Sequence, residues 1–140
     1  MSVTAGSVVA IAAVAFVALW LVITFVLSFA AGWNGLAARY RSELPFTGRT
    51  WSMRSGRMGV VRYNGVLTVG VNPAGMYLAM LPLFRLAHPP LFVPWSDITV
   101  SSARRFLADF IVFEFRQAPG TSLWLFDRFG REVLETAQAR

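Results

Sequence analysis

The sequence lacks cysteine and lysine altogether, has one histidine, and carries no charged side chain before Arg39. Without cysteine there is no disulfide framework, no zinc–thiolate site and no thiol nucleophile. His88 alone cannot build a metal site, and the seven acidic residues lack the paired spacing that acid–base catalysis needs. The glycine-containing stretches lack the strand-then-helix context of a phosphate loop. We therefore expect no enzyme: no catalytic residue, no cofactor-binding residue and no metal-binding residue.

The absence of charge at the N-terminus coincides with a long apolar run from Val8 to Ala31. A helix of about 24 residues rises ~36 Å and can cross a hydrocarbon core of about 30 Å with some tilt. The roughly 109 residues that follow are enough for one compact domain and too few for two. We therefore predict a transmembrane helix over residues 8–31, a juxtamembrane segment over 32–49 and a single domain over 50–138.

Two other interpretations of the apolar run stay open, a cleaved signal peptide and a helix buried in a soluble domain. Ser28-Phe29-Ala30 resembles a small-x-small cleavage site, but no basic residue precedes the run, which is about twice as long as a usual signal-peptide core. The rest of the chain is too short to wrap a helix that is apolar all round. The pattern therefore favours a membrane anchor.

The distribution of basic residues predicts the orientation of that anchor. Basic residues follow the apolar run and none precedes it, so the positive-inside rule places the N-terminus outside and the domain in the cytoplasm. Trp33 and Tyr40 stand where an interfacial aromatic belt would lie on that side. The alternative, that these two side chains pack against the domain, is equally compatible with the sequence.

After Pro45 the hydrophobic period changes from that of a helix to the period of two that is typical of strands. We predict about seven short strands in a curved, partly open antiparallel β-barrel. Turns are predicted at Ser55-Gly56-Arg57 and at Asn64-Gly65, a strong hairpin signal, and a bulge is predicted near Asp109. The predicted strands cover residues 50–54, 58–63, 66–71, 76–81, 91–93, 98–102, 106–116 and 122–126.

The helical period returns at the C-terminus, where Asp127 can cap a helix that runs to about Ala137. We expect this helix to cover an open end of the barrel and its unpaired strand edges. Gly130 costs the helix about 1 kcal/mol relative to alanine, so its start is predicted to be irregular. The expected apolar stripe consists of Phe126, Phe129, Val133 and Ala137.

Three polar or aromatic residues of the domain are given structural roles. His88 lies between Ala87 and two prolines and is expected to hydrogen-bond locally within a loop. Trp95 is expected in the core because of its bulk and its apolar neighbours. Asp97 is expected to form turn-type hydrogen bonds to backbone N–H groups.

The stretch from Leu67 to Val100 carries a strand, a glycine-bearing turn, the aromatic strand Gly75-Met76-Tyr77-Leu78 and the segment Val93-Pro94-Trp95-Ser96-Asp97-Ile98. It resembles the bacterial pleckstrin-homology-like proteins and the related GRAM domains, over about residues 50–138. The whole layout is similar to a family of small bacterial membrane proteins with one helix before such a domain. The resemblance implies a fold, a binding role and a place in the bacterial inner membrane, without implying any chemistry.

Arginine supplies all 13 basic residues, and the net charge is +6. A GC-rich genome explains the absence of lysine, and a surface suited to phosphate or carboxylate is the functional alternative. In eukaryotic pleckstrin-homology domains, basic residues of the first hairpin bind phosphoinositide headgroups. Here we expect general adhesion to anionic lipid, because the lysine of that pattern is missing. The candidate contacts for anionic lipid or a partner are Arg49, Arg54, Arg57 and Arg62.

The expected function is that of a non-enzymatic, membrane-anchored binding module. Its domain would be presented to a protein, a peptide or a lipid headgroup at the cytoplasmic surface, so the expected partners are the bilayer, a protein and anionic headgroups. No nucleic acid is expected, because the aromatic residues alternate as core and do not interleave with the arginines. The alternative is a small accessory subunit whose transmembrane helix packs against the helices of a larger complex.

Overall fold

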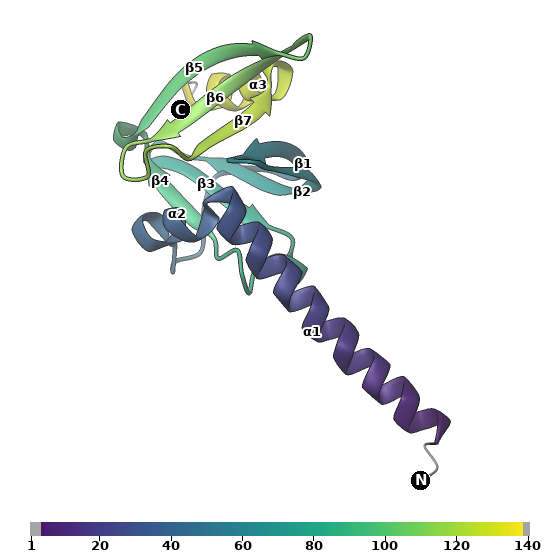
Figure 1. Ribbon diagram of the computed structural model, residues 1–140. Helices are drawn as coiled ribbons and strands as arrows, with labels where there is room; N and C mark the ends of the chain where they lie inside the picture. The colour runs from purple at the N-terminus through teal and green to yellow at the C-terminus, as the bar shows by residue number, and fades with distance from the viewer. Residues whose placement is uncertain (1–3, 139–140) are drawn as a thin grey trace.

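The computed structural model describes residues 4–138 and shows a long N-terminal helix attached to a curled β-sheet (Figure 1). Helix α1 (Ala5–Ala31) extends away from the other elements. Short 3-10 turns occupy Pro82–Phe84 and Trp95–Asp97. The remaining elements are α2 (Trp33–Tyr40), β1 (Arg49–Met58), β2 (Val61–Val71), β3 (Gly75–Met80), β4 (Leu91–Pro94), β5 (Ile98–Arg105), β6 (Ala108–Phe115), β7 (Ser122–Phe126) and α3 (Asp127–Gln138).

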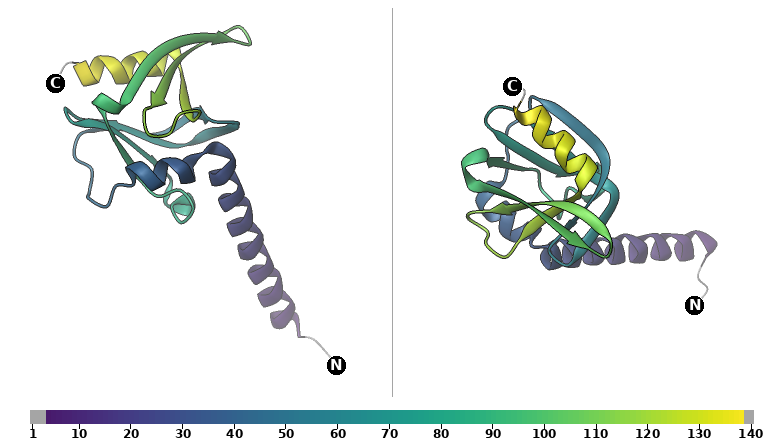
Figure 2. Two further views of the ribbon diagram at one scale, coloured as in Figure 1. Left: turned by 60° about the vertical axis from the view of Figure 1, so that its left-hand side comes forward. Right: turned by 90° about the horizontal axis from the view of Figure 1, so that it is seen from above.

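The seven strands form one sheet in the order β4-β3-β2-β1-β7-β6-β5, and every neighbouring pair is antiparallel. Strand β1 joins the two halves, because only its last residues, Arg57 and Met58, pair with β7. The two halves face each other across the core, and α3 lies at the open end between them (Figure 2). The predicted fold class, an apolar N-terminal helix, a partly open antiparallel barrel and a C-terminal helix, is confirmed.

Helix α1 is long and apolar enough to cross a membrane, a property that a signal sequence shares. Most of its side chains are exposed; the helix contacts the domain from Trp20 onward, and Thr24, Ser28 and Ala31 are buried there. The helix ends at Gly32, whose φ of +80° and hydrogen bonds to the preceding turn form a left-handed C-cap. Glycine suits this position because the left-handed conformation strains other residues.

The juxtamembrane helix that the sequence predicts is present as α2, and its apolar face belongs to the core of the domain. Trp33 and Leu36 are fully buried, and Tyr40 is nearly so. The indole N–H of Trp33 donates a hydrogen bond of 2.8 Å to the carbonyl of Pro89. Trp33 and Tyr40 therefore pack against the domain, which was one of the two sequence interpretations, and do not form a free aromatic belt.

The first hairpin differs from the prediction. Ser55, Gly56 and Arg57 continue β1, and the turn is formed by Gly59, with a φ of +57°, and Val60. The sequence Asn64-Gly65 lies inside β2, where the β1–β2 register shifts between Arg54 and Gly56. The positive φ of Gly65, +71°, serves this irregularity in the pairing, and no turn is made there.

The β5–β6 hairpin also differs from the prediction. Phe106 and Leu107, predicted to open a long strand, form the β5–β6 turn with φ values of 52° and 65°. Both side chains are 90% exposed. The pairing of β5 with β6 runs without a break from the pair Ile98–Phe115 to the pair Arg105–Ala108, so the predicted bulge near Asp109 is absent.

Helix α3 confirms the predicted terminal helix and runs without an irregular start. Val133 is fully buried, and Phe129 and Ala137 pack against the core. Phe126 does not belong to this stripe, because it ends β7 and is 39% exposed. Gly130 faces Ile111 of β6 so closely that an added Cβ would lie 2.6 Å from two of its side-chain carbons. The glycine therefore lets the helix approach the sheet.

Candidate functional site

A groove lies on the outer face of the sheet between the tips of two hairpins. The turns β1–β2 and β5–β6 end on the same side of the domain, and the β5–β6 turn lies farther from α1 than the β1–β2 turn does (Figure 2). An added Cβ on Gly59, in the first turn, would lie 2.8 Å from the carbonyl oxygen of Ala31, so this turn touches the end of α1. The groove has a volume of about 240 Å³. Its lining is Gly56, Arg57, Val60, Arg62, Arg105, Phe106, Phe110, Trp124 and Phe126.

The floor of the groove is aromatic. The ring of Phe110 on β6 stacks on Phe126 with 5.1 Å between centroids and meets Trp124 edge-on at 5.5 Å. These residues point outward because their strand neighbours, such as Phe113 and Leu123, occupy the core. The outer face of an antiparallel sheet is usually polar. An aromatic cluster there is a feature that packing within the domain does not require.

Three arginines lie over this floor. The guanidinium of Arg105 is 5.2 Å from the Trp124 ring centroid, and that of Arg57 is 6.0 Å from the same ring. The guanidinium of Arg62 is 5.7 Å from the Phe126 ring. Arg57 and Arg62 are direct partners across β1 and β2. Each guanidinium is thus held by the quadrupole of a ring and keeps donors free for an anion.

The electrostatics of the groove have one sign. Among residues 4–138 no acidic side chain lines it, and Val60 and Phe106, which are 77% and 90% exposed, add apolar surface. Within residues 4–138 these arginines donate one intramolecular hydrogen bond, from Arg57 Nε to the carbonyl of Gly59 at 3.1 Å. The arrangement can hold an apolar group on the floor while the arginines bind a carboxylate or phosphate beside it.

The structure separates the four arginines named from the sequence. Arg57 and Arg62 stand together in the groove. Arg49 lies 5.1 Å from the ring of Trp51, and Arg54 lies 4.9 Å from the ring of Phe129 on α3. The sequence prediction missed Arg105 and the aromatic floor. The alternation of Phe110, Trp124 and Phe126 with core residues was the available signal that they share the outer face.

No protein-family model, no curated protein and no solved structure matches the chain. The inference of function therefore depends on the geometry of the chain itself. Residues 4–138 contain no cluster of histidine and carboxylate side chains able to hold a metal ion.

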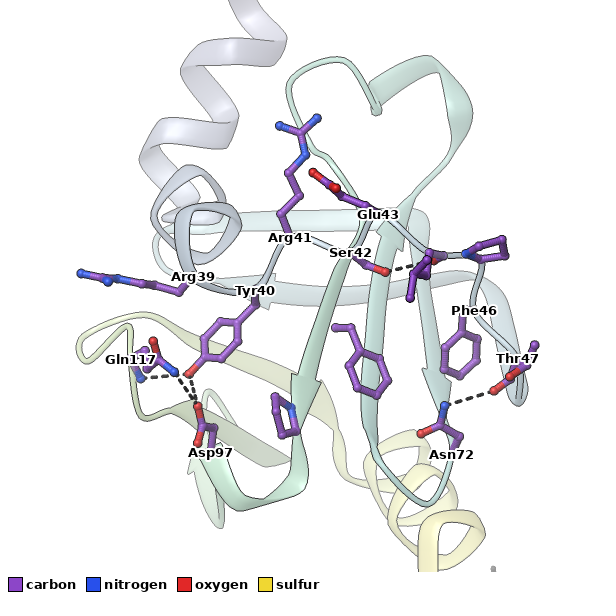
Figure 3. A pocket seen from close by; sticks show the side chains of 14 residues that line it. Arg39, Tyr40, Arg41, Ser42, Glu43, Phe46, Thr47, Asn72, Asp97 and Gln117 are labelled. Atoms are coloured by element: carbon purple, nitrogen blue, oxygen red, sulfur yellow. Dashed lines mark hydrogen bonds between the residues drawn. The ribbon is translucent and has the colours of Figure 1, made fainter.

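A second hollow of about 480 Å³ lies under the segment that joins α2 to β1 (Figure 3). Tyr40 Oη donates to Asp97 Oδ2 at 2.9 Å and accepts from the N–H of Gln117 at 3.0 Å. Gln117 Nε2 donates to the same carboxylate oxygen at 3.1 Å. Phe46 stacks on Tyr77 at 4.7 Å. The hydrogen bonds fix the end of α2, and the stacking of Phe46 holds the segment against β3, so we interpret this hollow as structural.

The polar network corrects one sequence expectation. The carboxylate of Asp97 accepts hydrogen bonds from two side chains, those of Tyr40 and Gln117, and none of the turn-type backbone bonds that were expected. Desolvation by burial raises the pKa of Tyr40, so its hydroxyl keeps the proton that it donates.

His88 fulfils the local role expected of it. It is fully buried, and its Nδ1 donates to the carbonyl of Phe84 at 3.2 Å, which leaves Nε2 to accept from Tyr63 Oη at 2.9 Å. Burial lowers the pKa of the imidazole, so the neutral form is favoured. Trp95 is half-buried against the core and donates from its indole N–H to the carbonyl of Asn72 at 2.9 Å.

Proposed function

We propose that this protein is a non-enzymatic binding module, anchored in a membrane by α1, whose groove holds an acidic segment of a partner protein that also carries apolar side chains. The observation that carries the proposal is the aromatic floor overlaid by Arg57, Arg62 and Arg105 with no carboxylate in the lining. The order of the strands and the terminal helix support the resemblance to pleckstrin-homology-like domains as part of this proposal.

The chemistry of the groove favours a protein segment over a lipid headgroup. A headgroup offers phosphate and hydroxyl groups, which gain little from contact with an apolar floor built from Phe110, Trp124 and Phe126. Aromatic and arginine side chains are enriched at the centres of protein interfaces, where they supply most of the binding energy. A peptide with both kinds of side chain can pack its apolar groups on the rings and pair its carboxylates with the guanidiniums.

The anchor and its orientation belong to the same proposal. We place α1 in the bacterial inner membrane with the N-terminus outside and the domain in the cytoplasm, because the basic residues all follow α1. Retention of α1 is supported by the burial of Thr24 and Ser28 against the domain, since signal-peptide cleavage after Ala30 would remove these packed residues.

The alternative function is an accessory subunit whose helix packs against partner helices. Thr24, Ser28 and Ala31 of α1 pack against its own domain, whereas the small residues of its N-terminal part, such as Gly6 and Ala10, stay exposed and could pair with another helix. If α1 serves only as an anchor, replacing residues 5–19 by an unrelated apolar sequence should leave partner binding unchanged. Loss of partner binding in that chimaera would favour the accessory-subunit interpretation.

The test is site-specific photocrosslinking of the full chain in native membranes. A photoreactive amino acid at Val60, in the groove, should crosslink to a discrete protein, and the same amino acid at the equally exposed Leu44 should not. The crosslink should be lost in Arg105→Glu and retained in Arg104→Glu. Arg104 is a matched control because it lies beside Arg105 in β5 but outside the groove. Crosslinks to lipid alone, or a crosslink equally sensitive to both variants, would contradict the proposal.

A further inference from the structure

The loop between β3 and β4 carries apolar side chains that the domain does not bury. Leu83 is 72% exposed and Leu86 is 68% exposed, on either side of Phe84. The ring of Phe84 packs against Trp20 of α1 with 5.0 Å between centroids. The loop therefore runs back along the N-terminal helix as far as Trp20, and Figure 1 shows it beside the lower face of the domain, on the side toward which α1 extends.

The length of α1 fixes where Trp20 lies in a membrane. Residues 5–19, about 15 of them, rise only ~22 Å in a helix, whereas the hydrocarbon core is about 30 Å thick. A span that begins at Ala5 must therefore continue past Trp20 by roughly 8 Å to cross the core. Tilting the helix places Trp20 deeper still. The part of the loop that contacts Trp20 thus lies within the leaflet on the domain side.

The composition of α1 beyond Trp20 agrees with this depth. Apolar side chains that are about half exposed or more continue along the helix to Phe29, which is 77% exposed. A bilayer that stopped at Trp20 would leave all of them in water. Between this part of α1, α2 and the loop lies a hollow of about 620 Å³ whose walls include the apolar Phe25, Phe29 and Leu86 and the polar Ser28, Asn34 and Arg41. The apolar surfaces of helix and loop adjoin at Trp20 and Phe84 and along one wall of this hollow.

The loop is held in its place from within the domain. The carbonyl of Phe84 accepts from His88, the carbonyl of Pro89 accepts from Trp33, and Arg85 Nε donates to the carbonyl of Met80 at 3.1 Å. These bonds fix the backbone while leaving Leu83 and Leu86 outward. Little ordering entropy is therefore lost when the exposed side chains meet a partner.

We propose that the tip of the loop dips into the bilayer beside α1, with Leu83 and Leu86 in contact with acyl chains and the exposed Arg85 extended to the level of the headgroup phosphates. The occupant of this surface is lipid, because the surface adjoins the membrane-spanning face of α1. The protein then has two membrane contacts, a spanning helix and an inserted loop, which together fix the tilt of the domain and the height of its groove above the bilayer. This inference requires the membrane anchor of the proposed function and is independent of what the groove binds.

The absence of cysteine allows a direct test with the full chain. Single variants Leu83→Cys, Leu86→Cys, Ala15→Cys and Leu107→Cys are labelled with an environment-sensitive fluorophore and reconstituted in phosphatidylcholine–phosphatidylglycerol vesicles, with and without bromine on the acyl chains. Ala15 lies on the exposed part of α1, and Leu107 is an exposed leucine at the distal β5–β6 turn. Labels at Leu83 and Leu86 should show blue-shifted emission that brominated lipid quenches, as at Ala15, while the label at Leu107 should be unaffected.

The outcomes separate the loop from the anchor. Quenching at Ala15 but not at Leu83 and Leu86 overturns the inserted loop and leaves the anchor intact. The absence of quenching at all four positions overturns both. Equal quenching at Leu107 overturns the loop proposal as well, because it places the distal face of the domain on the lipid.

Discussion

The same substitution, glycine to alanine, should change stability in opposite directions in two helices of this protein. In Gly35→Ala the added methyl meets nothing within 4 Å, so the gain in helix propensity and the loss of unfolded-state freedom should stabilise the protein by about 0.5–1 kcal/mol. In Gly130→Ala the methyl would lie 2.6 Å from both Cβ and Cγ1 of Ile111. These atoms are close to the β6 backbone and cannot swing away.

Overpacking of this kind costs about 1–3 kcal/mol, and a propensity gain of at most about 1 kcal/mol offsets it only in part. We therefore expect Gly130→Ala to be destabilising and the two variants to differ by roughly 1–3 kcal/mol. Thermal unfolding of the full chain in detergent, followed by tryptophan fluorescence, should show midpoints that differ by at least about 4 °C. Equal stabilisation by both substitutions would refute the close packing of α3 on β6.

Further predictions concern the buried polar groups and the orientation of the chain. Because burial lowers the pKa of His88 below its ordinary 6.5, the unfolded chain takes up a proton that the folded chain does not, so the free energy of unfolding should fall as the pH drops below about 6.5. His88→Gln should remove that part of the pH dependence, and urea unfolding at several pH values above the range of the carboxylates measures it. Tyr40→Phe should destabilise the protein by about 1–3 kcal/mol, because it removes one of the two side-chain donors to Asp97 and leaves the Gln117 N–H without its acceptor; a change within experimental error would show that water replaces the hydroxyl. A cytoplasm-dependent reporter fused after Arg140 should be active, and activity of an export-dependent reporter at the same place would reverse the proposed orientation.

The elements with a strong local period were predictable. The apolar run of α1, the short helix α2 and the terminal helix α3 were each visible as a change of period, and most strands were found within a few residues. The prediction of the first hairpin was wrong because Asn64-Gly65 is a strong local turn signal that the longer pairing of β1 with β2 overrides. Ser55 Oγ accepts from the N–H of Gly65 at 2.9 Å, which stabilises that glycine inside the strand.

The prediction for residues 106 and 107, which form the β5–β6 turn, was wrong for a different reason. Phe106 and Leu107 have no turn chemistry, and both adopt the left-handed conformation that favours glycine or asparagine. Their exposure and strain were invisible in a pattern that reads as the start of an apolar strand. Such strained, exposed apolar residues occur where function competes with stability.

Two of the three arginines of the candidate site were accessible from the sequence, and the aromatic floor was not. Arg57 and Arg62 lie in one hairpin, so their proximity follows from local pairing. Arg105, Phe110 and Trp124 come from strands that are distant in the chain, and only the order β1-β7-β6-β5 brings them to the same groove. That order depends on long-range pairing, for which a single sequence has no signal.

The most direct test of the proposed function is a binding titration of the full chain in nanodiscs of neutral phosphatidylcholine. The probe is a peptide in which leucines alternate with glutamates, matching the aromatic floor and the arginines. Arg105→Glu should weaken its binding roughly tenfold or more, a change of about 1.4 kcal/mol, and Arg104→Glu should weaken it much less. Equal affinity of the two variants, or binding to anionic vesicles with none to the peptide, would contradict a protein-binding groove.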